Sequence, residues 1–120
     1  MTHILAVDDS ASMRQMVAFA LQAAGFEVTE AEDGQAALDI AQTKQFDAVV
    51  ADVNMPRMDG ITLIRSLRGL DSYKFTPLLM LTTEAGMDKK QEGKAAGATG
   101  WIVKPFEPDQ LVNTLQRVLG

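Results

Sequence analysis

The chain has 120 residues, of which 47% are hydrophobic, and it carries a formal net charge of −5 with no cysteine. This length and apolar content fit one folded domain with its own core and exclude a disordered chain. The lack of cysteine excludes disulfides and thiolate metal sites, and the acidic balance argues against a protein that binds nucleic acid by itself. No apolar run approaches the roughly 20 residues of a membrane span, and the start of the chain lacks a signal-peptide pattern, so we expect a cytoplasmic protein.

The charges are distributed unevenly along the chain. Residues 1–60 contain ten acidic and three basic residues, whereas residues 61–120 contain six acidic and eight basic residues. We therefore expect acidic side chains of the first half to gather in one place, and the second half to present a different surface to partners.

Five short segments rich in valine, isoleucine and leucine are predicted to be buried strands. They alternate with longer segments in which apolar residues recur at spacings of three and four, which is typical of a helix with one buried face. Gly25 follows the first helical segment where a glycine often ends a helix, and Pro108 opens the last one at a position suited to a first turn. The predicted strands are 3–7, 27–31, 46–51, 77–82 and 100–104, and the predicted helices are 11–24, 34–43, 60–69, 87–96 and 108–119.

This alternation predicts a single α/β domain with a parallel sheet. The central strands are apolar throughout rather than alternating, which is typical of a sheet covered by helices on both faces. Right-handed crossovers then give an open, doubly wound sandwich, and five strands suggest the flavodoxin-like strand order 2-1-3-4-5. The predicted elements occupy residues 1–120, so we expect no separate output domain.

Three carboxylates lie at the ends of strands that this order places side by side. Asp8 and Asp9 follow the first strand, and Asp52 follows the third. In such sheets ligands bind beyond the carboxyl ends of the strands where the strand order reverses, which here lies between these two strands. Two unit charges 4 Å apart repel by about 4 kcal/mol at an effective dielectric constant of 20, so three acids there favour a bound hard cation. Mg²⁺ fits this site because it prefers oxygen ligands and retains several waters.

The neighbouring strands add a hydroxyl and an ammonium group at the same edge. The fourth strand ends at Thr82 and Thr83, and the fifth ends at Lys104, although lysine is rarely buried without a partner. An acid, a cation, a hydroxyl and an ammonium group together are the parts of a phosphoryl-transfer site. Plainer interpretations remain open, namely acids that cap helices, an ordinary strand threonine and a lysine that is only a structural counter-ion.

Four segments in order along the chain resemble the signature segments of response-regulator receiver domains: VDDS, DVNMPRMDGITLI, MLTTE and VKPFEPDQL. The resemblance covers essentially the whole chain, and it is strongest to stand-alone, CheY-like chemotaxis regulators. It implies a phosphorelay signalling protein that accepts a phosphoryl group from a histidine kinase in a reaction that needs Mg²⁺, for which Mn²⁺ can substitute. It also implies that the protein is not an enzyme, because it catalyses only its own phosphorylation and dephosphorylation.

The resemblance assigns a role to each residue of the site. The implied metal ligands are Asp9, Asp52 and the backbone carbonyl of Asn54, with Asp8 in the outer shell acting through water. Pro105 resembles a proline that follows a cis peptide bond in this family.

The same resemblance names the residues that handle the phosphoryl group. Asp52 is the implied phosphoacceptor, Lys104 pairs with the phosphoryl group, and Thr82 is the switch hydroxyl that moves to bond it. The backbone N–H groups of Asn54 and Thr83 are implied to contact other phosphoryl oxygens.

Two further positions are implied to tune the lifetime of the phosphorylated state, and one is implied to signal it. Asn54 and Glu84 occupy the tuning positions, and an amide and an acid there resemble chemotaxis regulators with a short-lived phosphorylated state. The switch aromatic is implied at Trp101, where motor-binding members usually have tyrosine. Those members also have a lysine where this chain has Gly86 and Met87, so two positions depart from the motor-binding pattern.

The implied partners are a histidine kinase and a downstream protein that binds the face made by the fourth helix, the fifth strand and the fifth helix. The resemblance implies a monomer without direct DNA or membrane binding, most similar to proteins of chemotaxis. An alternative role on the same chemistry is a phosphate sink or relay intermediate rather than a motor-binding regulator.

Three interpretations outside this role are less well supported by the residues. A flavin or nucleotide binder conflicts with Asp8 and Asp9, which would repel a phosphate in the absence of metal. A Mg²⁺-dependent phosphohydrolase with an aspartyl-phosphate intermediate would carry a second acid where this chain has Asn54. A receiver that is never phosphorylated conflicts with the complete set of Asp9, Asp52, Thr82 and Lys104.

Overall fold

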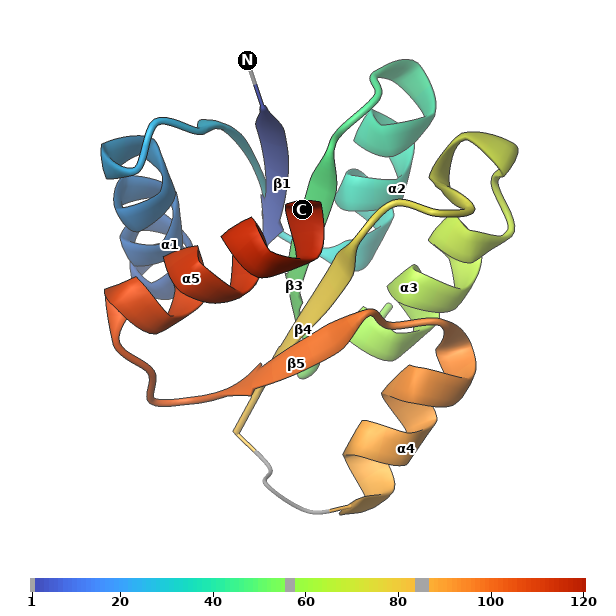
Figure 1. Cartoon of the computed structure of the whole chain (residues 1–120). Helices are drawn as coiled ribbons and strands as arrows, with labels where there is room; N and C mark the ends of the chain where they lie inside the picture. Colours follow the sequence, from blue (N-terminus) through green and yellow to red (C-terminus); the bar gives the residue numbers. More distant parts are fainter. Residues whose placement is uncertain (1, 56–57, 84–86) are drawn as a thin grey trace.

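The computed structural model describes residues 2–55, 58–83 and 87–120. Strands and helices alternate along the described chain, with one short 3-10 turn (η1) between the third helix and the fourth strand (Figure 1). The elements are β1 (His3–Val7), α1 (Ala11–Ala23), β2 (Glu27–Ala31), α2 (Gly34–Thr43), β3 (Ala48–Asp52), α3 (Gly60–Arg68), η1 (Asp71–Tyr73), β4 (Leu78–Thr82), α4 (Met87–Ala96), β5 (Gly100–Val103) and α5 (Pro108–Leu119). No helix in these described ranges is long and apolar enough to cross a bilayer.

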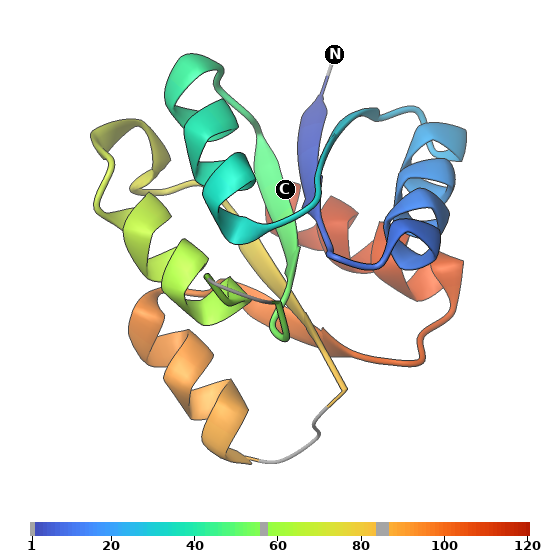
Figure 2. The same cartoon turned by 180° about the vertical axis from the view of Figure 1, so that it is seen from behind.

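The five strands form one parallel sheet in the order β2-β1-β3-β4-β5, which confirms the predicted topology. Helices α1 and α5 cover one face of the sheet, and α2, α3 and α4 cover the other (Figures 1 and 2). The strand order reverses between β1 and β3, so the chain leaves these two neighbouring strands toward opposite faces. A polar crevice is expected at their carboxyl ends for this reason.

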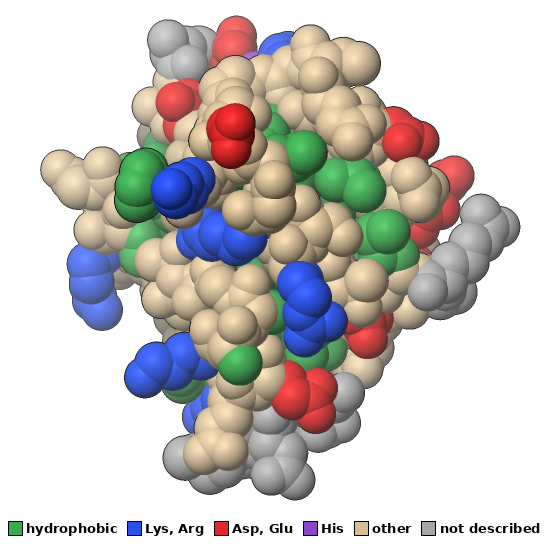
Figure 3. Space-filling view, turned by 90° about the vertical axis from the view of Figure 1, so that its right-hand side faces the viewer, with side chains coloured by type: hydrophobic (Ala, Val, Ile, Leu, Met, Phe, Trp, Pro, Cys, Tyr) green, Lys and Arg blue, Asp and Glu red, His purple; other side chains and the backbone are tan. Residues whose placement is uncertain are grey.

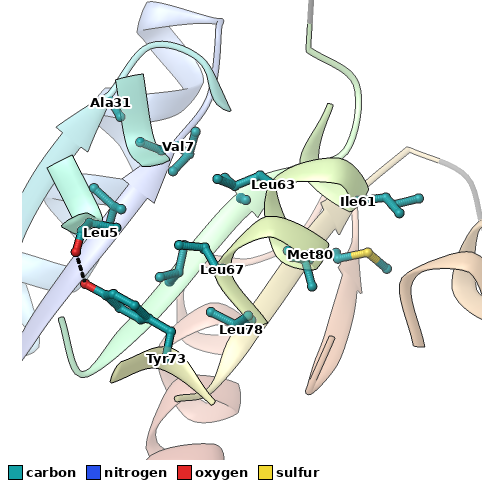
Figure 4. Close-up of a cluster of buried hydrophobic side chains, with 14 of the residues drawn as sticks. Leu5, Val7, Ala31, Ile61, Leu63, Leu67, Tyr73, Leu78 and Met80 are labelled. Atoms are coloured by element: carbon teal, nitrogen blue, oxygen red, sulfur yellow. Dashed lines mark hydrogen bonds between the residues drawn. The ribbon is translucent and has the colours of Figure 1, made fainter. Parts of the chain in front are cut away.

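Alternate residues of the central strands supply two separate hydrophobic cores. In β3, Val49 and Ala51 face the core beneath α2 and α3, whereas Ala48 and Val50 face the core beneath α1 and α5. The first core also holds Tyr73, whose hydroxyl donates to the Ala41 carbonyl oxygen 3.0 Å away (Figure 4). Strands buried on both faces in this way are held rigidly, which fixes the positions of the residues at their ends.

The predicted helices agree closely with the structure, but three strands begin or end one or two residues from their predicted bounds. Strand β3 spans Ala48–Asp52 rather than 46–51. The preceding residue, Asp47, bonds His3 through its exposed carboxylate, which accepts from the His3 backbone N–H at 2.8 Å. Strand β4 begins one residue later and β5 ends one residue earlier than predicted, and η1 was not predicted. Asp52 is therefore the last residue of β3.

The helix caps remove one plain interpretation of the acids. Helix α1 is capped by Ser10, whose hydroxyl accepts from the Met13 N–H at 3.3 Å. Helix α3 is capped by Asp59, whose carboxylate accepts from the Thr62 N–H at 2.8 Å. None of the three acids that follow or end β1 and β3 serves as an N-cap, so helix capping does not explain them.

Gly60 at the start of α3 lies very close to the end of β3. Its backbone N–H donates to the Val53 carbonyl oxygen at 3.0 Å, and a Cβ at this position would overlap the backbone carbonyl of Asp52. The absence of a side chain therefore lets α3 begin directly above the residue that ends the central strand.

We expect Gly60→Ala to lower the free energy of unfolding by about 1–3 kcal/mol, because backbone of a buried strand cannot move aside as a flexible side chain can. Urea denaturation would measure the change. Gly100→Ala is a matched control, since its Cβ would lie 3.4 Å from Leu79 Cδ2, an ordinary contact. Equal stability of both variants would contradict this account.

Candidate functional site

Three carboxylates meet at the carboxyl edge of the sheet, where β1 and β3 end. Oxygen atoms of Asp8, Asp9 and Asp52 lie within 4.8 Å of one another. Asp8 and Asp52 are almost fully buried, with 2% and 5% of their surface exposed, whereas Asp9 is exposed. Residues separated by more than 40 positions in the sequence are thus brought together as the parallel topology predicts.

Lys104 places its ammonium group between the two buried acids. Its Nζ lies 3.0 Å from Asp52 Oδ1 and 3.4 Å from Asp8 Oδ2, and 12% of the side chain is exposed. This lysine follows the end of β5, and its backbone N–H donates to the Thr82 carbonyl oxygen at 2.7 Å. The pairing explains how lysine is accommodated at the end of a buried strand.

Asp8 is held on all sides by the protein. Its Oδ1 accepts from the Ser10 N–H at 2.9 Å, while its own backbone N–H donates to the Ala31 carbonyl oxygen at 3.2 Å. Its backbone carbonyl accepts from Arg14 Nη1 at 2.8 Å. For the Asp9 carboxylate, by contrast, no hydrogen bond or ion pair is found among the described residues. The exposed acid thus remains available to a ligand.

The surroundings of Asp52 raise the pKa of its carboxyl group above the ordinary value for aspartate. Burial is the main cause, since it penalises the charged form, and the nearby Asp8 carboxylate acts in the same direction. The Lys104 ammonium and the Asn54 backbone N–H oppose this effect by bonding the charged form. The acid is therefore only partly compensated by the protein, and an added cation would stabilise its charged form.

The other predicted phosphoryl-contacting residues lie at the ends of the neighbouring strands. Thr82 is fully buried as the last residue of β4, one position beyond the residue that pairs with Asp52. Asn54 and Thr83 lie beside each other, with Asn54 Nδ2 3.5 Å from Thr83 Oγ1. The predicted cis peptide bond is confirmed between Lys104 and Pro105. Glu84, predicted to tune the lifetime, lies outside the described residues.

Trp101 lies at the surface against α4 rather than among the acids. The residue is 37% exposed, and Lys90 Nζ lies 5.4 Å from the ring centroid. Together with Gln91 and Lys94 these two residues line a shallow hollow of about 200 Å³. The aromatic residue that the sequence identified is therefore placed on the α4–β5 surface.

The donor set of the crevice fits a hard divalent cation. It consists entirely of oxygen atoms from three carboxylates and adjacent backbone, which suits Mg²⁺ or Mn²⁺ and not the nitrogen and sulfur sites of zinc or copper. Sequence analysis did not identify Arg14 as a support of this crevice. The position of Arg14 close behind the acid pair, as the fourth residue of the following helix, is the signal that could have indicated it.

We expect Lys104→Met to raise the Asp52 pKa further in metal-free protein, because the variant loses the ammonium group that stabilises the carboxylate. A ¹³C titration of the carboxyl carbon would measure this. A raised folded-state pKa means that the folded protein holds this proton more tightly than the unfolded chain. This contribution to stability is lost as the pH rises through the folded pKa.

Lys44→Met is the matched control for that titration. Lys44 lies at the opposite edge of the sheet, with Nζ 5.9 Å from the Phe46 ring centroid, so its loss leaves the Asp52 pKa unchanged. An Asp52 pKa that stayed constant or fell in Lys104→Met would contradict the pairing described above.

Comparison with known proteins agrees with this geometry. Residues 4–116 match the model of the response regulator receiver domain. The chain is 40% identical to the chemotaxis protein CheY of Pseudomonas aeruginosa over 116 residues, which cover 96% of this chain and 94% of that protein. It is 58% identical to the solved chemotaxis protein CheY4 of Vibrio cholerae, with a TM-score of 0.95 and 98% of both chains covered.

A second solved structure, also similar to this chain, contains a metal ion. It is the receiver domain of a sensor histidine kinase from Pseudomonas aeruginosa, with a magnesium ion coordinated in its active site cleft. It is 28% identical to this chain, with a TM-score of 0.92, and 99% of this chain and 98% of that one are covered. Asp8, Asp9 and Asp52 form the acidic trio that is typical of the receiver-domain magnesium site. The chain therefore belongs to the response regulator receiver domain family, as a CheY-like signalling protein rather than an enzyme.

Proposed function

We propose that Asp52 accepts a phosphoryl group from the phosphohistidine of a partner kinase in a Mg²⁺-dependent reaction, and that the protein thereby switches a downstream partner. One observation carries the proposal above all others. A lysine ammonium lies within 3.4 Å of both buried acids, so an acceptor carboxylate, a cation site and a phosphate-binding cation share one crevice.

Each group in the crevice has a part in this transfer. An oxygen of Asp52 attacks phosphorus, the phosphorus–nitrogen bond of the donor breaks, and the imidazole leaves with its electron pair and then takes a proton from solvent. Lys104 turns from Asp52 toward the incoming phosphoryl oxygens, and the N–H groups of Asn54 and Thr83 donate to others. These donors are preorganised by the ends of rigid strands.

The metal would be held by Asp9, Asp52 and the Asn54 backbone carbonyl, with Asp8 in the outer shell. The contacts of the acid pair support the difference between Asp8 and Asp9, because Asp8 is already bonded to Ser10 and Lys104 whereas Asp9 is exposed. When bound, Mg²⁺ neutralises the negative charge that gathers as phosphoryl and carboxylate approach each other. The resulting acyl phosphate then hydrolyses, and Asn54 together with Glu84 keeps its lifetime short.

The switch would carry the change from Thr82 to the face made by α4, β5 and α5. Thr82 moves to bond the phosphoryl oxygen, and Trp101, which pairs with Met80 of the neighbouring strand β4, responds at the surface. Lysine and arginine side chains are spread over the side of the molecule that carries α3 and α4 (Figure 3). Lys90 and Lys94 of α4 lie beside Trp101, so a partner with complementary acidic groups suits this part of the switch face.

Chemotaxis is the pathway that the similar proteins favour, since two of them carry that function in their names. We place the exchange in the cytoplasm, between a monomeric receiver, its histidine kinase and a protein target. The indole of Trp101 is bulkier than the tyrosine of motor-binding members, and this supports a second candidate role as a phosphate sink or relay intermediate. A phosphohydrolase is disfavoured because Asn54 cannot act as the acid that such enzymes need.

We expect Asp52→Asn to abolish Mg²⁺-dependent phosphorylation by a histidine kinase, because the amide is not a nucleophile toward phosphorus. Phosphotransfer profiling against the kinases of the host would measure this and would identify the cognate donor. Asp33→Asn is the matched control, since asparagine caps α2 as well as aspartate does and the residue lies outside the crevice. Phosphorylation of Asp52→Asn at the wild-type rate would refute the assignment.

Trp101 is the single tryptophan of the chain, so its fluorescence reports directly on the proposed switch. We expect the emission to change when Mg²⁺ and beryllofluoride, a phosphoryl analogue, are added together, and to stay constant in Asp52→Asn. Unchanged emission in wild-type protein that demonstrably binds the analogue would show that Trp101 does not take part.

A further inference from the structure

Arg14 makes two contacts that lead from the second strand to the acid pair. It lies in the first turns of α1 with 18% of its side chain exposed. Its Nη1 donates to the backbone carbonyl oxygen of Asp8 at 2.8 Å, and its Nε donates to Glu30 Oε1 at 3.1 Å. Glu30 belongs to β2, so the guanidinium ties the start of α1 and the end of β1 to the neighbouring strand.

The carbonyl that Arg14 holds belongs to the peptide unit that joins Asp8 to Asp9. The other side of Asp8 is also held by β2, because its backbone N–H donates to the Ala31 carbonyl oxygen at 3.2 Å. A planar peptide whose oxygen is held cannot rotate, so the direction in which the chain enters Asp9 is determined.

Asp9 depends on its backbone for its position. Its side chain is exposed, and among the described residues nothing bonds its carboxylate. We propose that Arg14, steadied by Glu30, is a positioning residue that holds the Asp8–Asp9 peptide so that the Asp9 carboxylate lies beside Asp52 and can bind the metal. This inference rests on the proposed function and adds a residue outside the acids to the metal site.

The direction in which the Mg²⁺ affinity changes when Arg14 is replaced distinguishes a positioning role from a purely electrostatic one. A cation near the crevice repels Mg²⁺, so its charge by itself would weaken metal binding, and its removal would tighten it. A residue that positions Asp9 does the opposite, because its removal lets the exposed acid turn away. Arg14→Met keeps the length of the apolar stem but loses both the charge and the donors.

An amide NMR titration with MgCl₂ tests the proposal. We expect Arg14→Met to bind Mg²⁺ about tenfold more weakly than wild-type protein, the lower end of the effect of losing a group that orients a metal ligand. Arg117→Met, in the last turn of α5, removes the same charge elsewhere and leaves the affinity unchanged. Unchanged or tighter binding by Arg14→Met would overturn the positioning role.

The spectra without magnesium provide a second, independent readout. In EDTA, we expect the Asp9 and Ser10 amide resonances to shift or broaden in Arg14→Met, while the unfolding midpoint stays close to that of Arg117→Met. If wild-type protein shows no response to MgCl₂, the proposed metal site fails, and the metal-free spectra alone decide the role of Arg14. An Asp9 amide resonance that is the same in Arg14→Met and wild type would overturn it.

Discussion

The placement of Lys104 between two buried carboxylates is the interaction on which the site depends. Three acids within 4.8 Å would repel one another strongly in a buried crevice, and the ammonium at 3.0 Å from Asp52 offsets part of that repulsion. The compensation is incomplete, since the pKa of Asp52 stays above its ordinary value. The crevice of the folded protein therefore still attracts a cation, and with it any group that is bound to a cation. A fully neutralised ion-pair network would not.

The parallel sheet makes this placement possible. Asp8, Asp52 and Lys104 follow or end β1, β3 and β5, and parallel strands bring their carboxyl ends to one edge. Burial on both faces holds β1 and β3 in place, so the acids cannot separate to relieve their repulsion. Ser10 and Asp59 cap the adjacent helices, which leaves the crevice acids free of that task. The rest of the fold thereby holds together a site whose acids repel one another when no metal ion is bound.

The surface formed by α4 and β5, which would respond to phosphorylation of the site, is packed differently from the rest of the fold. In its described part, helix α4 contacts the core through small residues, with Gly93 lying against the Met80 side chain and Ala96 buried. Large apolar side chains instead anchor α3 and α5. If the described residues of α4 carry most of its packing, these small contacts allow the helix to shift at low cost, which suits the element that bears Lys90 against Trp101.

Sequence alone determined the class of the fold, the strand order and the identity of the acids, because hydrophobic periodicity and residues at strand ends are local properties of the chain. It also indicated Gly25 as the glycine that follows α1. In the structure this glycine adopts a φ of +97°, which other residues rarely adopt. Only the tertiary structure decided the division of roles among charged groups. Asp8 is enclosed while Asp9 is exposed, and Asp59 rather than a crevice acid caps α3. Arg14 donates directly both to the Asp8 carbonyl oxygen and to Glu30. These outcomes depend on which atoms packing brings within hydrogen-bonding distance. The residue pattern of a single strand or helix does not predict such contacts between elements.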